Sequence, residues 1–275
     1  MISIILILLF VFSVLSVPVC HGVISGLYLY GMKIFPGLFI SFILTNILVR
    51  ILQQKNINNP WILVITGLMT GFPNGAYICS WYNKNNPENR LGDMLAGIIN
   101  IPSPAFLISY VYINILEKCI SLPMFLALTY TPVILCSYMA ILLFRDKDNK
   151  KDNAPHIKND KKLIFHFFEE AVDSSINTAL KLGAYVIIFS VIVNIIMHFS
   201  QSNTAGLLIS YLFEISNGLA IIKNAGIPMN ITVLLTVLLD AFGGVCIIMQ
   251  TKSICSSYIS IKKYIYQKLV LCIVC

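Results

Sequence analysis

The chain has 275 residues, of which 57% are hydrophobic and 11% are charged, and its mean hydropathy is +0.83. Soluble domains carry about a quarter charged residues, so this composition excludes an ordinary water-soluble protein and indicates a polytopic membrane protein. The formal net charge of +7 then indicates orientation in the lipid bilayer rather than nucleic-acid binding, and we expect no nucleic-acid partner. The eight cysteines show no zinc-ligand spacing, so we expect neither a metal nor a cofactor.

The first part of the chain reads as two spans and an interrupted third. Residues 1–20 are apolar and lack a basic start and a cleavage site, which predicts a retained transmembrane helix. An amphipathic piece (21–33) precedes a second span (35–52). The apolar segment 61–82 follows, and Gly71-Phe72-Pro73-Asn74-Gly75 at its centre predicts a break in the helix.

The next stretch continues the helical pattern with a second break. The pair Asn86-Pro87 predicts the start of a helix that runs to about Asn100. Residues 101–104, Ile-Pro-Ser-Pro, interrupt it before the apolar run 105–116. Glu117-Lys118 predicts a tight turn, and residues 119–144 predict a further span.

Residues 145–162 form a hydrophilic loop in which basic residues outnumber acidic ones, so we expect this loop to be cytoplasmic. Residues 163–181 predict an amphipathic helix at the membrane interface, and 182–199 predict a span. Residues 207–222 predict one apolar helix that contains Glu214, and 231–250 predict a span broken at Asp240-Ala241-Phe242-Gly243-Gly244. An amphipathic tail, 256–268, leads to the apolar end of the chain.

Charge bias also indicates how residues 61–82 sit in the membrane. A full crossing would leave the basic loop 145–162 outside the cell. A re-entrant hairpin with its tip at Phe72 to Gly75 instead keeps that loop, Lys84 and Arg90 on the same side as Arg50. The sequence therefore favours a hairpin.

Two pieces of the chain occur twice. Residues 35–48 match 183–196, aligning Asn46 with Asn194, and residues 66–76 match 236–245, aligning Phe72 with Phe242. The second half carries one extra helix, around Glu214. Transporters are often built from paired halves whose interrupted helices hold the substrate near the middle of the bilayer. Non-helical backbone at that depth needs protein or a water-filled cavity around it.

Several stretches carry a family resemblance. "GFPNGA" (71–76), "NPENRLGDMLA" with the following Ser-Pro break, "FEISNGL" (213–219) and "FGGVCIIMQ" (242–250) together resemble the YlbJ/SpoVV family of sporulation membrane proteins. The resemblance covers about residues 21 to 268. It implies two Gate, or nucleoside-recognition, domains, a design similar to concentrative nucleoside transporters, and passage of dipicolinic acid from the mother cell towards the forespore. The chain departs from the family at Asn74, Tyr77, Ile101 and Ile248, which affects the expected substrate more than the fold.

The expected architecture is an all-α transmembrane helical bundle with two Gate-like repeats, each carrying an interrupted or re-entrant hairpin helix. It divides into an N-terminal transmembrane helix (1–20), a first repeat (21–116), a span with the basic loop (117–162) and a second repeat (163–275). The expected location is the outer forespore membrane or the mother-cell membrane of a spore-forming bacterium.

The expected substrate-binding residues lie at or near the breaks. Their alternatives are a simple kink at Pro73 and Gly75, an interfacial position for Glu214, helix–helix contacts for Ser216 and Asn217, and a helix cap or a cation ligand for Asp240. The segment Gln250-Thr251-Lys252 is expected at a membrane surface. The full set is Phe72, Pro73, Asn74, Gly75, Asn100, Ser103, Glu214, Ser216, Asn217, Asp240, Gly243 and Gly244.

No pairing of a nucleophile with a base and no phosphate-binding loop occurs in the sequence, so we expect no enzyme. The expected function is transport of a small anionic solute, dipicolinate by the resemblance, with a possible coupling cation. The alternatives are transport of a nucleoside or other small solute, and a structural or assembly role in sporulation membranes.

Overall fold

The computed structural model describes residues 2–3, 6, 10, 13–54, 59–87, 91–144, 161–200, 204–255 and 258–275, and all of its regular elements there are helices. This confirms the expected all-α class. Three helices are long and apolar enough to cross a membrane, and a bent pair counts as a fourth if its two parts form one span. The three are Leu122–Phe144, Phe168–Ser200 and Met229–Cys255, and the bent pair joins Ser16–Ile34 to Leu38–Leu52 at 56°.

The first three elements follow one another without a gap. They are α2 (Ser16–Tyr28), the π-helical segment η1 (Leu29–Ile34) and α3 (Phe35–Gln54). Glycines on α2 allow close packing against α9, because a Cβ at Gly22 would lie 2.5 Å from the Val191 backbone. Most of the predicted first helix, 1–20, lies outside the described residues.

The segment predicted to be interrupted is interrupted. The helix α4 (Pro60–Thr70) is capped by the Asn59 side chain, which accepts from the Trp61 amide, and α5 (Asn74–Asn85) follows after three residues. Gly71 takes φ +73°, and the Phe72–Pro73 peptide is cis. The two helices pack along each other, so the chain reverses at the Gly71–Pro73 connection.

The second break also forms, although the helix before it is shorter than predicted. The helix α6 (Leu91–Leu95) ends well before Asn100, because the chain turns through residues 96–99 into the non-helical stretch 100–103. Helix α7 (Pro104–Phe106) continues directly into the π-helical η2 (Leu107–Ile115). The predicted turn is confirmed, since Glu117 and Lys118 both take positive φ values. The span α8 (Leu122–Phe144) follows.

A single helix of 40 residues, α9 (Lys161–Ser200), replaces the interfacial helix and separate span expected for 163–199. It packs against α2, α3, α10 and α13, and these contacts along its length explain why it continues as one rod. Residues 145–160 of the basic loop lie outside the described part of the chain, so their expected cytoplasmic location stays a prediction.

The helix predicted over 207–222 is wrong in one respect, because it is two helices. Helix α10 (Thr204–Phe213) stops at Glu214, and α11 (Ile215–Asn224) packs back along it. Glu214 adopts an extended backbone conformation, and its side chain accepts from the Asn217 amide as the N-cap of α11. The interruption therefore comes from a capping carboxylate rather than from glycine or proline.

The last elements are α12 (Met229–Phe242), α13 (Gly244–Cys255) and α14 (Ile261–Val274). The predicted break in 231–250 is confirmed at Gly243, which takes φ +82°. Helices α12 and α13 nevertheless follow each other as one apolar stretch, Met229–Cys255. The two segments that match in sequence, 66–76 and 236–245, thus differ in structure. The first lies in a reversing helix pair, and the second lies in a nearly continuous span.

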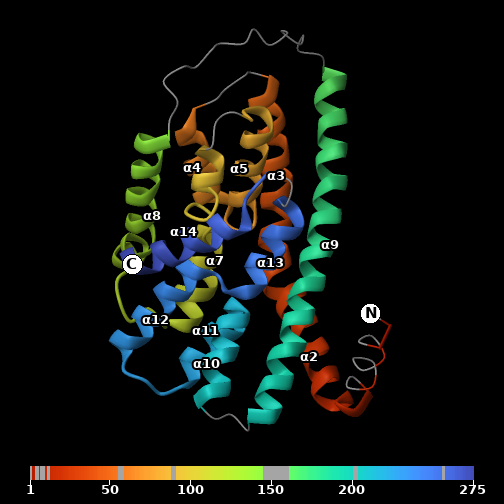
Figure 1. Ribbon diagram of the computed structural model, residues 1–275, viewed down its shortest axis with the longest axis vertical. Coiled ribbons are helices and arrows are strands. Elements are labelled where there is room, and N and C mark those ends of the chain that lie inside the picture. The colour runs from red at the N-terminus through yellow and green to blue at the C-terminus, as the bar shows by residue number, and fades with distance from the viewer. Residues whose placement is uncertain are drawn as a thin grey trace.

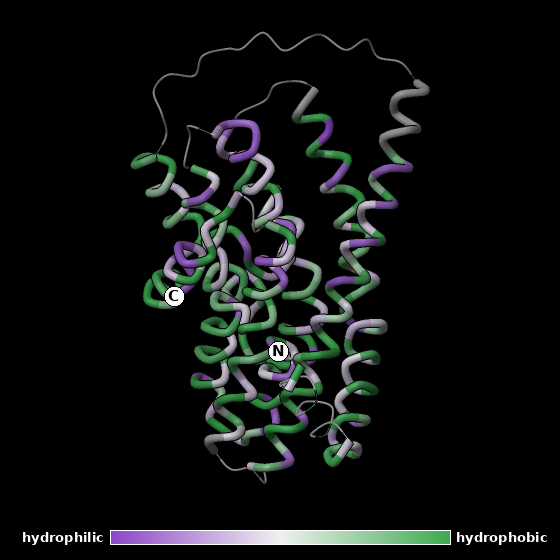
Figure 2. Tube along the Cα trace, turned by 45° about the vertical axis from the view of Figure 1, so that its right-hand side comes forward, coloured by the Kyte–Doolittle hydropathy of each residue, from purple (hydrophilic) through white to green (hydrophobic). Residues whose placement is uncertain are grey.

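Figure 1 shows how the reversing pairs are arranged: α4 and α5 lie in the upper half of the molecule, and α10 and α11 lie in the lower half. The long α9 runs beside both along one flank, and α8 flanks the opposite side. Figure 2 shows hydrophobic residues along most of the helical surface, while hydrophilic residues gather at the upper end and at the centre.

Candidate functional site

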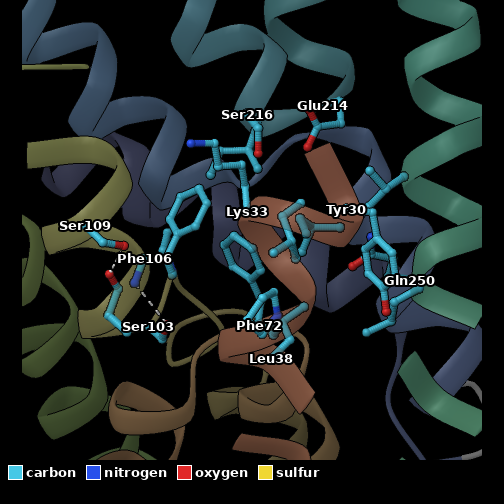
Figure 3. A pocket seen from close by; sticks show the side chains of 18 of the residues that line it. Tyr30, Lys33, Leu38, Phe72, Ser103, Phe106, Ser109, Glu214, Ser216 and Gln250 are labelled. Carbon is cyan, nitrogen blue, oxygen red and sulfur yellow. Dashed lines mark hydrogen bonds between the residues drawn. The ribbon is translucent and has the colours of Figure 1, made fainter. Parts of the chain in front are cut away.

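A central cavity of ≈ 260 Å³ opens where the interrupted helices meet. The interruptions at Phe72, Ser103 and Glu214 contribute to its wall. The fourth interruption, at Gly243, is followed by the first turns of α13, which complete the wall. In Figure 3, Glu214 and Ser216 lie at the top of the view and Phe72 and Ser103 at the bottom. The lining residues used below are Tyr30, Lys33, Phe72, Ser103, Phe106, Glu214, Ser216, Ile247 and Gln250.

The segments around the first two breaks supply a largely apolar wall that also carries the Ser103 and Ser109 hydroxyls. The backbone amide of Phe72 donates to the Ile101 carbonyl at 2.9 Å, so the tip of the α4–α5 pair is tied to the second break. The Phe72 ring lies 6.5 Å from the Phe106 ring, centroid to centroid. Ser103 caps α7 by accepting from the Phe106 amide at 3.3 Å. Aromatic faces with a few polar groups are typical of small-molecule sites.

The second half supplies the carboxylate. Glu214 is 2% exposed, and its Oε2 accepts from the Asn217 amide at 2.7 Å. The N-terminus of α11, which a substrate carboxylate could otherwise bind, is thus already occupied by a carboxylate of the chain. The Tyr110 hydroxyl donates to the Ser216 carbonyl at 3.1 Å and ties η2 to this tip. Glu214 is thus buried within the protein at the start of α11, and whether it lies at the membrane interface or deeper stays a prediction.

Of the lining residues, only Phe72, Ser103, Glu214 and Ser216 were predicted. The polar residues among the others include Tyr30, Lys33 and Gln250. Tyr30 and Lys33 come from η1, and Gln250 comes from α13. Gln250 and Thr251, expected at a membrane surface, are 3% and 0% exposed within the protein, and their depth in the membrane stays a prediction. The spacing of Ile247 and Gln250, three residues apart after the double glycine, was the available signal, since it places both on one face of a helix.

Asn100 is buried behind the cavity rather than in its wall. Its Oδ1 accepts from the Ala76 amide at the start of α5, at 3.2 Å. Its Nδ2 donates to the Thr251 hydroxyl of α13 at 3.2 Å and to the Tyr264 hydroxyl of α14 at 2.7 Å. We call these residues, with Lys268, the Asn100 network. Because its amide groups are taken by the protein, Asn100 holds the second break in place instead of binding a ligand.

Pro73, Asn74 and Gly75 are also outside the cavity wall. A Cβ at Gly75 would lie 2.7 Å from the Ile99 carbonyl oxygen, so the group that approaches Gly75 closely is the protein's own backbone. Asn74 is 1% exposed, and its side-chain amide has no hydrogen-bond partner among the described residues. The structure therefore brings Phe72 alone of this tip to the cavity.

The remaining predicted residues lie at the margin of the site. The Asn217 amide group donates to the Ser190 hydroxyl of α9 at 3.4 Å, which is a helix–helix contact. Asp240 is fully buried in the last turn of α12, and neither carboxylate oxygen has a hydrogen bond within the described part of the chain, so it caps no helix. Gly243 and Gly244 both take φ +82° and form the bend between α12 and α13.

A second cavity of ≈ 400 Å³, the basic cavity, lies between α3, α5, α9 and α13. Arg50 and Lys84 line it, no carboxylate does, and the buried Trp81 Nε1 in its wall has no acceptor among the described residues. The ion pair of Arg50 with Glu170 of α9 holds the guanidinium at this end. The full lining of the basic cavity is Asn46, Val49, Arg50, Tyr77, Ser80, Trp81, Lys84, Ser174, Ile254 and Tyr258.

The two cavities share elements. Ile247 and Gln250 line the central cavity and Ile254 lines the basic one, and a spacing of three and four residues puts all three on one face of α13. Helix α3 likewise carries Leu38 at one cavity and Asn46 at the other. Within the described residues, no group of three His, Cys, Asp or Glu side chains is placed to hold a metal ion.

Comparisons of the chain with protein-family models, with curated proteins and with solved structures found no match.

Proposed function

We propose that the protein is a multi-pass membrane carrier that moves a small solute through the central cavity. One observation carries the proposal: helix interruptions from both halves of the chain converge on that cavity. Carriers place their sites at such interruptions near the middle of the bilayer, and irregular backbone at that depth has to face protein or a cavity. A protein that only scaffolds a membrane has no need of this arrangement.

The orientation of the reversing pairs supports two opposed repeats. The α4–α5 pair extends from one end of the molecule and the α10–α11 pair from the other (Figure 1), as re-entrant hairpins of inverted repeats would. We therefore propose that α10–α11, and not α12–α13, corresponds to α4–α5. Two reciprocal hydrogen bonds support the same symmetry: Asn46 donates to Ser175, and Asn194 donates to Ser25.

We propose that the solute is a small aromatic anion, for which dipicolinate is the candidate that the family resemblance implies. Lys84 and the Trp81 Nε1, which has no acceptor among the described residues, give the basic cavity donors, and Arg50 adds a guanidinium that is paired with Glu170 of α9. Such a cavity attracts anions towards the route. Lys33 and the rings of Phe72 and Phe106 then offer a cation and flat apolar faces in the central cavity. The proposed setting is the outer forespore or mother-cell membrane during endospore formation.

A nucleoside is the second candidate, and Glu214 favours it. A carboxylate that faces the central cavity accepts hydrogen bonds from ribose hydroxyls, whereas it repels a second carboxylate. The Gln250 amide can pair with a base edge because it carries both a donor and an acceptor. Removing the Glu214 charge should therefore weaken the binding of a nucleoside but leave the binding of dipicolinate equal or stronger.

The test is uptake into proteoliposomes that contain the purified protein. Labelled dipicolinate and labelled uridine are supplied separately, with solute-loaded vesicles for counterflow. We expect dipicolinate flux that Lys84→Gln lowers severalfold, and no change in Lys252→Gln, whose lysine is exposed on α13 and lines neither cavity. Glu214→Gln should leave dipicolinate affinity equal or higher. Uridine flux that falls in Glu214→Gln would instead support the nucleoside, and absence of flux for every solute tried would favour a structural role.

The proposed orientation has its own test. Asn153→Cys lies in the basic loop, which is expected to be cytoplasmic. An impermeant thiol reagent added to intact cells should leave this cysteine unlabelled and should label it after the membrane is opened. A cysteine-free background provides the control, and ready labelling of intact cells would overturn the topology.

A further inference from the structure

One lysine lies fully buried at the centre of the protein without an acidic partner. Lys268 of α14 is 0% exposed, while the ion pairs found among the described residues join Arg50 to Glu170, Lys223 to Glu117 and Lys263 to Asp93. Burying an ammonium group without compensation costs several kcal/mol, so the groups that surround Lys268 need an explanation.

The Lys268 ammonium is held by backbone carbonyls instead. Its Nζ donates to the Asn100 carbonyl and, at 3.0 Å, to the Ala241 carbonyl. It also lies 5.8 Å from the centroid of the Tyr264 ring, within the range of a cation–π contact. Asn100 begins the break before α7, and Ala241 lies in the last turn of α12 beside the bend at Gly243. One ammonium group thus bridges both interrupted spans.

These two carbonyls are available for different reasons. Ala241 lies in the last turn of α12, where carbonyls have no intrahelical donor and carry partial negative charge from the helix dipole. Asn100 lies in the non-helical stretch 100–103, five residues after the end of α6. Carriers with broken helices use such carbonyls to coordinate Na⁺ or a proton. In this chain the same kind of oxygen pair is already bound to a side-chain cation.

We infer that Lys268 is a tethered cation, fixed where a free monovalent cation would otherwise bridge the two interrupted spans. Two consequences follow. The intact protein needs no free Na⁺ at this position, and shortening the Lys268 side chain leaves a carbonyl-lined space that binds a small monovalent cation. The binding part of this inference holds whether or not the protein is a carrier.

The experiment measures the melting temperature of the purified protein in detergent, using tryptophan fluorescence. Each variant is melted in choline, sodium, methylammonium and tetramethylammonium chloride at equal concentration. Lys268→Ala opens the space, Lys268→Met fills it without a charge, and Lys252→Ala removes an exposed lysine from α13 as the matched control.

The tethered cation predicts a specific pattern. Lys268→Ala should melt well below the wild type and regain several degrees in methylammonium or sodium chloride, but none in tetramethylammonium chloride, whose ion is too large. Lys268→Met should be destabilised in every salt, because both carbonyls lose their donor. The wild type and Lys252→Ala should melt alike in all four salts.

Three outcomes would overturn the inference: Lys268→Met as stable as the wild type, Lys268→Ala unresponsive to every small cation, or a sodium-specific rise in the melting temperature of the wild type. The last measurement needs no variant, so it decides the matter even where Lys268→Ala fails to accumulate. Uptake of dipicolinate by wild-type proteoliposomes in sodium and choline buffers adds a second readout, and equal rates are expected.

Discussion

The two halves of the chain interrupt their reversing helices by different means. In the first half, Gly71 takes a left-handed conformation, and the tip is tied by backbone and buried side-chain bonds to the second break. In the second half, the Glu214 side chain caps α11, and the tip is linked to its surroundings through Tyr110 and Asn217. Among the described residues, each tip has two hydrogen bonds to neighbouring segments, at 2.9 and 3.2 Å for the first tip and at 3.1 and 3.4 Å for the second. The longer bonds make the second tip the easier of the two to displace.

The largest expected contrast lies between two glycines that both take positive φ, Gly71 with ψ −174° and Gly243 with ψ −13°. A Cβ at Gly71 would lie 2.4 Å from the Ser103 amide nitrogen, whereas a Cβ at Gly243 would meet only the Ile247 side chain, at 3.5 Å. Gly71→Ala should lose about 2–6 kcal/mol of unfolding free energy, the sum of backbone strain of ~1–3 kcal/mol and overpacking of ~1–3 kcal/mol. Gly243→Ala should lose only about 1–2 kcal/mol of unfolding free energy, because left-handed backbone strain is its one cost. Denaturant unfolding in detergent measures both, and equal losses would contradict the proposed difference between the halves.

The next contrast compares the asparagine behind each tip. Asn100→Ala leaves the buried Ala76 amide without its partner and the Tyr264 hydroxyl with only the 3.5 Å bond from Thr251, and an unsatisfied buried group costs about 1–3 kcal/mol. Asn217→Ala removes a single bond of 3.4 Å, and such bonds between membrane helices average ~0.6 kcal/mol. Unfolding measured for the two variants in one detergent tests the order, and a larger loss for Asn217→Ala would reverse it.

Glu214 allows its role as a cap to be separated from its charge. Glu214→Ala removes the acceptor for the Asn217 amide and should lose about 1 kcal/mol, as other N-cap replacements do. Glu214→Gln keeps a carbonyl oxygen at that place, so its stability should stay close to the wild type. The same unfolding assay decides, and equal losses for both variants would show that the charge rather than the cap holds this tip.

The smallest effects concern the reciprocal bonds of Asn46 and Asn194. If the halves are related by symmetry, Asn46→Ala and Asn194→Ala should each lose ~0.6 kcal/mol, with Asn46 the more affected because it is the more buried of the two. Asn177→Ala, at a solvent-facing position on α9, should lose nothing. A loss in only one of the two variants would weaken the argument for paired halves.

The elements that sequence predicted well are those in which the cause is local. Glycine and proline at 71–73 and 102–104 disrupt a helix wherever they occur, and the apolar runs are long enough to identify spans. Glu214 lines the central cavity, but its role as the cap of α11 was not predicted, because glutamate is not among the preferred N-cap residues. A carboxylate in an apolar run indicates a functional group and says nothing of where the helix stops.

What sequence could not give depends on contacts between distant segments. Lys268 sits in an amphipathic tail, and its burial results from carbonyls more than 25 residues away along the chain. The helical spacing of Tyr264, Lys268 and Leu271, all fully buried on one face of α14, was the one local sign. Gln250 was likewise not predicted to line the central cavity, because that position depends on the packing of α13 against other segments.

The uninterrupted helix α9 has a mechanical consequence. At 1.5 Å per residue, its apolar stretch Phe168–Ser200 measures roughly 50 Å, against about 30 Å of hydrocarbon. Tilt alone would have to exceed the usual range of 0–40° to absorb that excess, so one end of the rod stands clear of the lipid. Helices α2, α3, α10 and α13 all pack against α9. A rigid displacement of α9 at one membrane face would therefore move elements at the other face with it.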